Sequence, residues 1–538
     1  MAKLNISELT SSLEVLLTSE AGDKVSAKEN VHFHHGQAAG TVVCIRPDVT
    51  KQTIDGIGTS FTESSAFVLA HLEPERRHEV MQGIFGESGA NFTLTRTPIG
   101  ACDFSVEGRY SCADVFNDTP LKHFNISRDK SGFDDEHYPG ISDSSFGLLQ
   151  MIQEALSIKA AQEDKRLRII ASAWTAPSWM KDIGDWFVPG TVENLFQGTG
   201  GSLKLEHYST YADYLIKFID AYKNEGVDIW GLTPVNEPCG NNGQWESMHF
   251  TPQAQHEFVK TYLGPKLKSG RYAEIKLLAY DHNRDQMEEW ADAMLADPQS
   301  AEFVYGIAVH WYSSSCKVYD EIFRRVHEKY PEKTIIHTEG CIDDLGKEAP
   351  EGVTDPARFK ESGWFDNDAF WWNRNATDWA YTASWPGVNP DDHPIYTPVH
   401  RYARDIIVGL DNWLSGWIDW NIVLDSKGGP NHVGNFCGAP IMIDTDTGQV
   451  HYTPLFHILK QFSRTIRPDD KAVQTDIRPV DMNADALHVC ATINSGRILS
   501  VQLLNTSKKA LDYSLQIGSR VANVDIPANS LQTIRVQL

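Results

Sequence analysis

Two glutamates stand at the ends of strongly apolar segments of this sequence. Glu237 lies in GLTPVNEPCG, from Gly231 to Gly240, and Glu339 ends the apolar run of KTIIHTEG. A carboxyl group at the end of a buried strand is costly to desolvate unless it is paired or used. Because proline favours an extended conformation in the residue before it, Pro238 predicts an extended Glu237.

Two carboxyl groups that face each other suit the cleavage of a glycosidic bond, for which one must be protonated and the other ionised. At a separation of about 5 Å and an effective dielectric near 20, two anions repel by roughly 3 kcal/mol, or about two pKa units. Such repulsion is enough to keep Glu237 protonated near neutral pH while Glu339 stays charged. Once Glu339 is bonded to a sugar, Glu237 can act as a base towards water. These arguments alone leave open which Glu takes which role.

The elements that must position the two acids follow from the pattern of the central chain. Short apolar runs alternate there with amphipathic stretches such as HYSTYADYLIKFIDAYKNEG and QAQHEFVKTYLG. Eight repeats of strand and helix predict a (β/α)₈ barrel, and no GxGxxG follows the first strand to favour a doubly wound sheet. The eight strand candidates are residues 53–63, 92–100, 166–174, 228–238, 274–283, 304–312, 333–340 and 414–422.

Active sites of such barrels are built at the carboxyl ends of the strands. Glu237 and Glu339 end the fourth and seventh strands, roughly across the barrel mouth, so their side chains can converge on one ligand. The other polar and aromatic residues at or after these strand ends are Arg96, Asp103, Trp174, Asn236, His282, His310, Tyr312, Trp420 and Asn421.

The two ends of the chain have a different pattern. Alternating apolar and polar residues recur in SLEVLLTS and TVVCIRPD near the start and in ALHVCATI, ILSVQLLN, LDYSLQI and LQTIRVQL near the end. Period-two patterning with closely spaced turns predicts a β-sandwich, and both chain ends are expected to contribute to it. We therefore predict sandwich strands in residues 1–53, the barrel in 54–463 and further sandwich strands in 464–538.

Composition narrows the class of partner. The 538 residues carry 48 Lys and Arg against 72 Asp and Glu, a net charge of −24. This acidic balance argues against nucleic acids and anionic lipid surfaces, and favours a small uncharged ligand such as a glycoside. We find no apolar run of membrane-spanning length, no secretory signal and no CxxC pair among the eight cysteines. These features favour a cytoplasmic protein with reduced thiols, or a secreted one if a signal has been removed.

Six motifs, in order, resemble glycoside hydrolase family 30, and most closely its glucosylceramidases and related β-glucosidases. They are TRTPIGACDFS, ASAWTAPSWMK, LTPVNEP, GIAVHWY, IIHTEGC and GWIDWNIVLDSKGGPN, and the likeness extends roughly from Thr53 to Asp470. The resemblance implies a barrel with a sandwich from both chain ends, and a retaining mechanism without metal or organic cofactor. It assigns the general acid/base to Glu237 and the nucleophile to Glu339.

The same resemblance implies roles for the neighbouring residues. Asn236 matches the amide that binds the sugar 2-hydroxyl, and His310 and Tyr312 flank the nucleophile. Arg96 is expected to orient or charge-balance Glu339. The remaining sugar-pocket positions are Asp103, Trp174, Trp420 and Asn435.

The sequence departs from that family pattern in the loop CGNNGQWESMHFTP and in residues 342–395, where a Trp-rich segment spans 364–385. That segment is open to three interpretations: a cleft wall, a homo-oligomer contact or simple packing. β-1,6-Glucanase, β-xylosidase and β-fucosidase activities remain alternatives to β-glucosidase. Two other classes are a sugar-binding barrel without catalysis and a metal-dependent hydrolase that uses the tract His32–His35.

Overall fold

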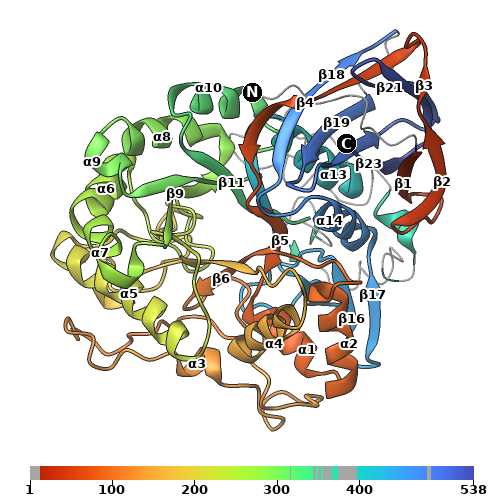
Figure 1. Ribbon diagram of the computed structural model, residues 1–538. Coiled ribbons are helices and arrows are strands. Elements are labelled where there is room, and N and C mark those ends of the chain that lie inside the picture. Colours follow the sequence, from red (N-terminus) through yellow and green to blue (C-terminus); the bar gives the residue numbers. More distant parts are fainter. Residues whose placement is uncertain are drawn as a thin grey trace.

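The computed structural model describes residues 12–314, 317–342, 347–348, 353–354, 365, 367–372, 397–480 and 486–538 (Figure 1). Most of the segment 342–395 therefore lies outside the described residues. In its Trp-rich part the structure describes residues 365 and 367–372, where Trp371 and Trp372 are buried.

Eight described strands form a closed parallel barrel, and each lies within one of the eight predicted segments. Around the barrel they run β5 (Gly56–Ser60), β6 (Leu94–Ile99), β7 (Arg168–Ala173), β8 (Gly231–Thr233), β9 (Lys276–Asn283), β10 (Val304–His310), β11 (Thr334–Glu339) and β14 (Leu414–Asp419). The last strand pairs with the first, since Gly416 lies opposite Gly56. The sequence prediction of the barrel is confirmed.

Side chains fill the barrel interior. A buried apolar cluster contains one residue from each of six strands: Leu94, Ile170, Leu278, Ala308, Ile336 and Ile418. Such a layer makes the barrel centre a packed core and leaves polar side chains to gather at its carboxyl end.

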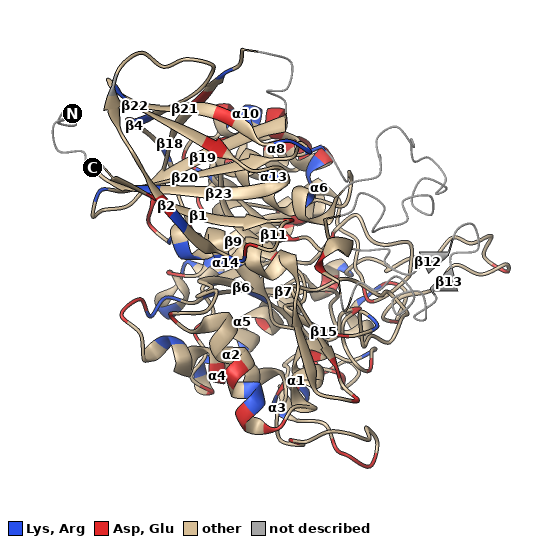
Figure 2. Ribbon diagram, turned by 90° about the vertical axis from the view of Figure 1, so that its right-hand side faces the viewer, with Lys and Arg blue, Asp and Glu red and all other residues tan. Residues whose placement is uncertain are grey.

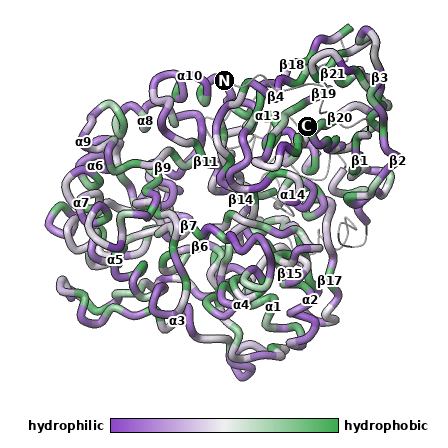
Figure 3. Tube along the Cα trace, viewed as in Figure 1, coloured by the Kyte–Doolittle hydropathy of each residue, from purple (hydrophilic) through white to green (hydrophobic). Residues whose placement is uncertain are grey.

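Helices surround the barrel because each has one apolar face. In α5 (Tyr208–Asn224), Tyr211, Leu215, Phe218 and Tyr222 recur every three or four residues and are buried. Figure 3 shows hydrophobic and hydrophilic residues alternating along these outer helices. The longer helices are α1 (Glu63–Ala70), α2 (Pro74–Phe85), α4 (Leu148–Ala160), α8 (Met287–Leu295), α10 (Asp320–Lys329), α13 (Pro398–Asp411) and α14 (Pro454–Thr465).

The predicted helix in QAQHEFVKTYLG is not regular. It is divided into α6 (Pro252–Glu257), a π-helical turn (Phe258–Leu263) and α7 (Gly264–Leu267). The remaining short helices are α3 (Ser127–Lys130), α9 (Pro298–Ala301) and the 3₁₀ turns η2 (Ser178–Met180), η3 (Leu205–His207), η5 (Gly270–Tyr272), η6 (Arg284–Gln286) and η7 (Asp368–Phe370).

Strands from both chain ends build the β-sandwich, which lies beside the barrel in Figure 1. β1 (Ser12–Ser19) pairs antiparallel with β23 (Ser530–Gln537). Within this domain β4 (Thr41–Thr53) lies between β18 (Lys471–Arg478) and β21 (Leu511–Ile517). The other strands are β2 (Ser26–His32), β3 (His34–His35), β19 (Leu487–Ile493), β20 (Ile498–Asn505) and β22 (Arg520–Ile526). The predicted sandwich from both ends is confirmed, and the tract His32–His35 lies in it.

Helices α13 and α14 contact both the barrel and the sandwich. On α14, Gln461 accepts a hydrogen bond from Thr18 Oγ1 (2.6 Å) and donates to Thr533 Oγ1 (2.9 Å). Two small sheets complete the described part: β15 (Val423–Asp425), β16 (Ile441–Asp444) and β17 (Gln449–Tyr452) form one, and β12 (Lys347–Glu348) and β13 (Val353–Thr354) the other.

Charged residues of both signs are dispersed over the outer helices and loops (Figure 2). No helix in the described ranges is long and apolar enough to cross a membrane. The seven described cysteines form no disulfide.

Candidate active site

Arg96, inside the barrel on β6, connects the ends of three other strands. Its Nη1 donates to Glu339 Oε2 (2.5 Å), and its Nη2 donates to Asn236 Oδ1 (2.6 Å) and Asp281 Oδ2 (2.7 Å). The Arg96 side chain is completely buried, so these charge-assisted bonds are little screened by water. Arg96 therefore holds Glu339 and also Asn236, which directly precedes Glu237.

Glu237 follows the end of β8. Its Oε1 lies 3.1 Å from His310 Nδ1 and 3.6 Å from His282 Nδ1. The other nitrogen of His310, Nε2, lies 3.1 Å from Asp281 Oδ1. In the pairing of β10 with β11, His310 lies opposite Glu339. His310 is thus placed between the two glutamates.

The predicted extended conformation of Glu237 is wrong. Glu237 has φ = 47°, in the left-handed region. Its N–H donates to the Asp281 carbonyl (2.9 Å), and its carbonyl accepts from Gly240 N–H (2.8 Å). These bonds to residues outside β8 hold a conformation that the following proline alone would not select.

Glu339 lies at the end of β11 and receives a second hydrogen bond, from the hydroxyl of Tyr312 to Oε1 (3.0 Å). The backbone N–H of Tyr312 donates to Asn283 Oδ1 (2.9 Å), at the end of β9. Both oxygens of Glu339 therefore accept a bond, and the carboxyl group is held in one orientation.

Asp281 is the residue that the sequence analysis missed. It accepts hydrogen bonds from the hydroxyls of Ser172, Thr233 and Thr338, at 2.6, 2.9 and 2.6 Å. Burial raises the pKa of its carboxyl group, but the charge of Arg96 and the bond from His310 hold that pKa well below its ordinary value. An ionised, fully buried carboxylate therefore connects Arg96 with His310.

A bulge in β9 turns Asp281 into this position. Tyr280 and Asp281 have φ values of 74° and 68°. In the pairing with β10, Ala308 lies opposite Tyr280 and Val309 opposite His282, so Asp281 is the extra residue. A bulge of this kind reorients side chains beside an active site. The only signal in the sequence was an acidic residue directly before His282, at the end of the fifth predicted strand.

The other predicted site residues form an aromatic pair and a polar pair. Trp174 and Trp420 are buried and stacked, with ring centroids 5.1 Å apart, and the Arg96 guanidinium lies 4.7 Å from the Trp174 ring. Asn435 Nδ2 donates to Asp103 Oδ2 (3.1 Å). Burial and the charge of Glu339 raise the pKa of Asp103 to about 8. Asp103 is thus paired with Asn435. The structure describes the positions of all ten predicted site residues.

The expected order of protonation is not found. Burial raises the pKa of Glu237, but the charges of His282 and His310 oppose it and leave the pKa below its ordinary value. Burial raises the pKa of Glu339 above its ordinary value although His310 and Arg96 oppose it. The sequence argument considered only the repulsion between the two acids, whereas two imidazoles lie next to Glu237. In the free protein the two pKa shifts are therefore opposite in direction to those expected from repulsion alone.

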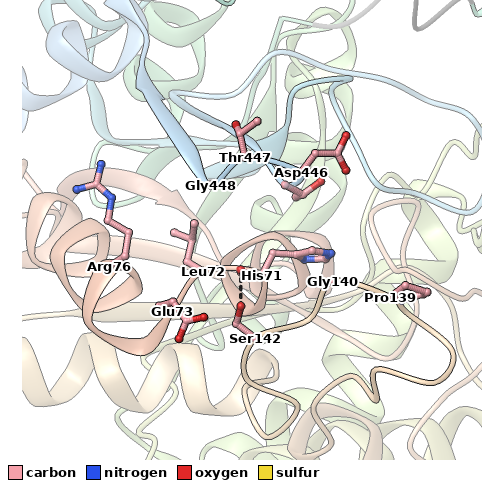
Figure 4. A pocket seen from close by; sticks show the side chains of 11 residues that line it. His71, Leu72, Glu73, Arg76, Pro139, Gly140, Ser142, Asp446, Thr447 and Gly448 are labelled. Atoms are coloured by element: carbon pink, nitrogen blue, oxygen red, sulfur yellow. Dashed lines mark hydrogen bonds between the residues drawn. The ribbon is translucent and has the colours of Figure 1, made fainter.

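A separate cavity of about 590 Å³ lies between the start of α2, the loop near Gly140 and the β16–β17 turn (Figure 4). Its lining includes His71, Arg76, Ser142 and Asp446, and none of the predicted site residues.

A closed parallel barrel with two glutamates at the ends of its fourth and seventh strands, beside stacked indoles, defines a glycoside hydrolase. The chain belongs to glycosyl hydrolase family 30. The model of that family's TIM-barrel domain matches residues 54–381 and 391–466, and the model of its beta sandwich domain matches 472–534. The family indicated by the motifs is confirmed.

Relatives with curated names carry several activities. The chain is 27% identical to putative glucosylceramidase 4 of Caenorhabditis elegans, over 97% of this chain and 88% of the relative. It is 26% identical to the lysosomal acid glucosylceramidase of Mus musculus, over 79% and 70%, and 24% identical to an endo-1,6-beta-D-glucanase of Neurospora crassa, over 78% and 72%. The crystal structure of SrfJ from Salmonella typhimurium shares the fold, with a TM-score of 0.77, 23% identity and coverage of 97% and 99%.

Proposed function

We propose that this protein is a retaining β-glucosidase of the glucosylceramidase type, with Glu339 as the nucleophile and Glu237 as the general acid/base. The observation that carries the assignment is the asymmetric surroundings of the two acids. Glu339 is fixed through both oxygens by Arg96 and Tyr312, as a nucleophile that must meet one carbon atom requires. Glu237 contacts imidazoles, which can exchange protons with it.

In the proposed first step, Glu339 attacks the anomeric carbon while Glu237 gives its proton to the departing oxygen. Glu237 enters this step protonated and Glu339 enters it ionised, and the carboxylate of Glu339 stabilises the positive charge that develops on the sugar ring. In the second step, Glu237 takes a proton from a water molecule whose oxygen attacks the anomeric carbon. The ester bond to Glu339 breaks, and the sugar leaves with its original configuration.

Binding of the sugar ring falls to the residues around the acids. Asp103 can accept hydrogen bonds from sugar hydroxyls, and Asn435 orients its carboxyl group. The stacked indoles of Trp174 and Trp420 supply apolar surface beside Arg96, next to which the apolar side of the sugar ring can lie. Asn236, held by Arg96, is placed for the 2-hydroxyl.

The assignment is tested with nitrophenyl β-glucoside. Glu339→Gln should abolish turnover, since a neutral amide cannot form the glycosyl ester. Glu237→Ala should still give a burst with this good leaving group and should slow substrates with poor leaving groups by about 10²–10⁴-fold. Added azide should rescue it and yield the β-glucosyl azide. Glu63→Gln removes another largely buried carboxylate, on α1, and should retain turnover. Near-normal activity of either active-site variant would refute the assigned roles.

A β-1,6-glucanase is the second candidate, because the glucanase of Neurospora crassa is a relative of nearly the same identity as the glucosylceramidases. Hydrolysis of glucosylceramide, gentiobiose, a β-1,6-glucan and nitrophenyl β-xyloside and β-fucoside, measured side by side, separates these substrates. A preference for the polymeric glucan would overturn the glucosidase assignment and leave the two-glutamate chemistry intact.

A further inference from the structure

His282 has no function in the steps proposed above, yet its side chain faces the acid/base. Its Nδ1 is buried and has no hydrogen-bond partner among the described residues, and the residue is 9% exposed. The nearest acceptor is Glu237 Oε1, at 3.6 Å. A buried ring nitrogen without a partner is unfavourable unless something binds it.

Three potential ligand atoms converge at this point. One atom from each of Glu237, His282 and His310 lies within 4.8 Å of the other two. Oε1 of Glu237 is 3.1 Å from His310 Nδ1 and 3.6 Å from His282 Nδ1. Ligands of a tetrahedral zinc ion at about 2.0–2.1 Å are roughly 3.4 Å from one another, so two of the three separations fit such an ion.

The chemistry of the ligands is also suitable. Two imidazoles and one carboxylate are a donor set for divalent d-block cations, and hard cations such as Mg²⁺ prefer oxygen ligands. His310 directs Nδ1 to this point because its Nε2 is bonded to Asp281. A bound cation would take the place of the proton between His310 Nδ1 and Glu237. A carboxylate behind a histidine is the arrangement that orients imidazole ligands in zinc sites.

We propose that Glu237, His282 and His310 form a site for a divalent d-block cation, and that Zn²⁺ bound there inhibits the enzyme reversibly. A cation on the Glu237 carboxylate prevents it from giving a proton to the leaving group. The Glu237 side chain is 14% exposed and that of His282 11% exposed, so a cation can reach both from the barrel mouth. Binding of the cation does not depend on the proposed glycosidase function, whereas the inhibition does.

Binding is tested without turnover. Protein treated with EDTA and desalted is titrated with Zn²⁺ by calorimetry and with Co²⁺ by visible absorption. We expect one site per chain, with Co²⁺ bands typical of low coordination number, and at least a tenfold loss of affinity in His282→Gln. The matched control is the double variant His32→Gln/His34→Gln, which removes two of the three histidines of the sandwich tract and should bind as the wild type does.

Two results would overturn the metal site: no binding of either cation, or binding that survives His282→Gln and is lost in the tract variant. The inhibition is measured separately, as the fold-decrease in nitrophenyl β-glucoside turnover with Zn²⁺ and its recovery with EDTA. Stoichiometric binding without a decrease in turnover would refute the inhibition alone. An enzyme without glucosidase activity that still binds Zn²⁺ through His282 would refute the proposed function and support the site.

Discussion

The Asp281 carboxylate acts on the electrostatics of the catalytic pair although the carboxylate itself touches neither glutamate side chain. Its carboxylate accepts bonds from Arg96 and His310, which in turn contact Glu339 and Glu237. The negative charge between two cationic side chains allows both to stay charged inside the barrel. We therefore regard Asp281 as a positioning residue.

Asp281→Asn should lower kcat/KM by about 10²-fold, since Arg96 and His310 lose their common anion and shift against the glutamates. Because the pKa of His310 is raised in part by this carboxylate, the pH profile should also move. The kinetics of nitrophenyl β-glucoside hydrolysis across pH test both effects. Asp285→Asn, at an exposed position four residues further on, is the control. A loss of activity without a change in the pH profile would indicate a merely structural role.

The protonation of His310 should be visible in the stability of the protein. Burial lowers the pKa of His310, but the charge of Glu339 and the bonds with Asp281 and Glu237 raise it to about 9. A histidine in the unfolded chain titrates near 6.5. The charged imidazole thus stabilises the folded protein fully below about pH 6.5, and this contribution is lost as the pH rises through about 9.

The stability of His310→Asn relative to wild type should therefore depend on pH. The difference in the free energy of unfolding should be largest near pH 6 and should shrink between about pH 6.5 and 9. Denaturant unfolding of both proteins at several pH values measures it. A difference that is constant across this range would contradict a raised pKa of His310.

At the scale of elements, the barrel strands bring the site together because they approach closely. On β5, a Cβ atom added to Gly58 would lie 1.9 Å from the Leu94 carbonyl oxygen of β6. Only glycine allows this approach. Two residues further along the same pair of strands, Ser60 lies opposite Arg96. The close contact at Gly58 therefore also determines the position of Arg96 along the barrel axis.

Gly58→Ala should destabilise the protein by several kcal/mol, in the range of severe overpacking, because the rigid backbone of β6 must move. It should also reduce activity, since Arg96 is carried by the same strand. Thermal unfolding and kcat/KM test the two effects. Gly496→Ala is the matched control, since its nearest neighbour to an added Cβ atom lies 3.4 Å away, at ordinary contact distance.

At the scale of the molecule, the sandwich is fastened to the barrel by α14. Gln461 also donates to the Leu531 carbonyl (3.1 Å), so one buried amide binds β1 and β23 at once. The strand β4 of the sandwich continues within three residues into β5 of the barrel. We expect the two domains to unfold as one unit.

Gln461→Ala should remove the acceptor of the Thr18 hydroxyl and the donor to Thr533 Oγ1 and the Leu531 carbonyl, at a cost of about 1–3 kcal/mol. Calorimetry should show a lowered Tm and should reveal whether the single transition becomes two as the domains uncouple. Gln299→Ala, on the exposed face of α9, is the control and should change Tm little. Two transitions in the wild type would contradict the expected cooperativity.

Much of this molecule follows from its sequence alone. The alternation of strands and helices, the patterning of both chain ends and the two glutamates at strand ends predicted the barrel, the sandwich and the candidate catalytic pair. These features are local, because periodicity reports which side of each element is buried. Only the tertiary structure decided the conformation of Glu237, the opposite pKa shifts of the two glutamates and the contacts of Asp281. These features depend on titratable side chains from five strands that meet within hydrogen-bond distance, and no spacing along the chain records such distances.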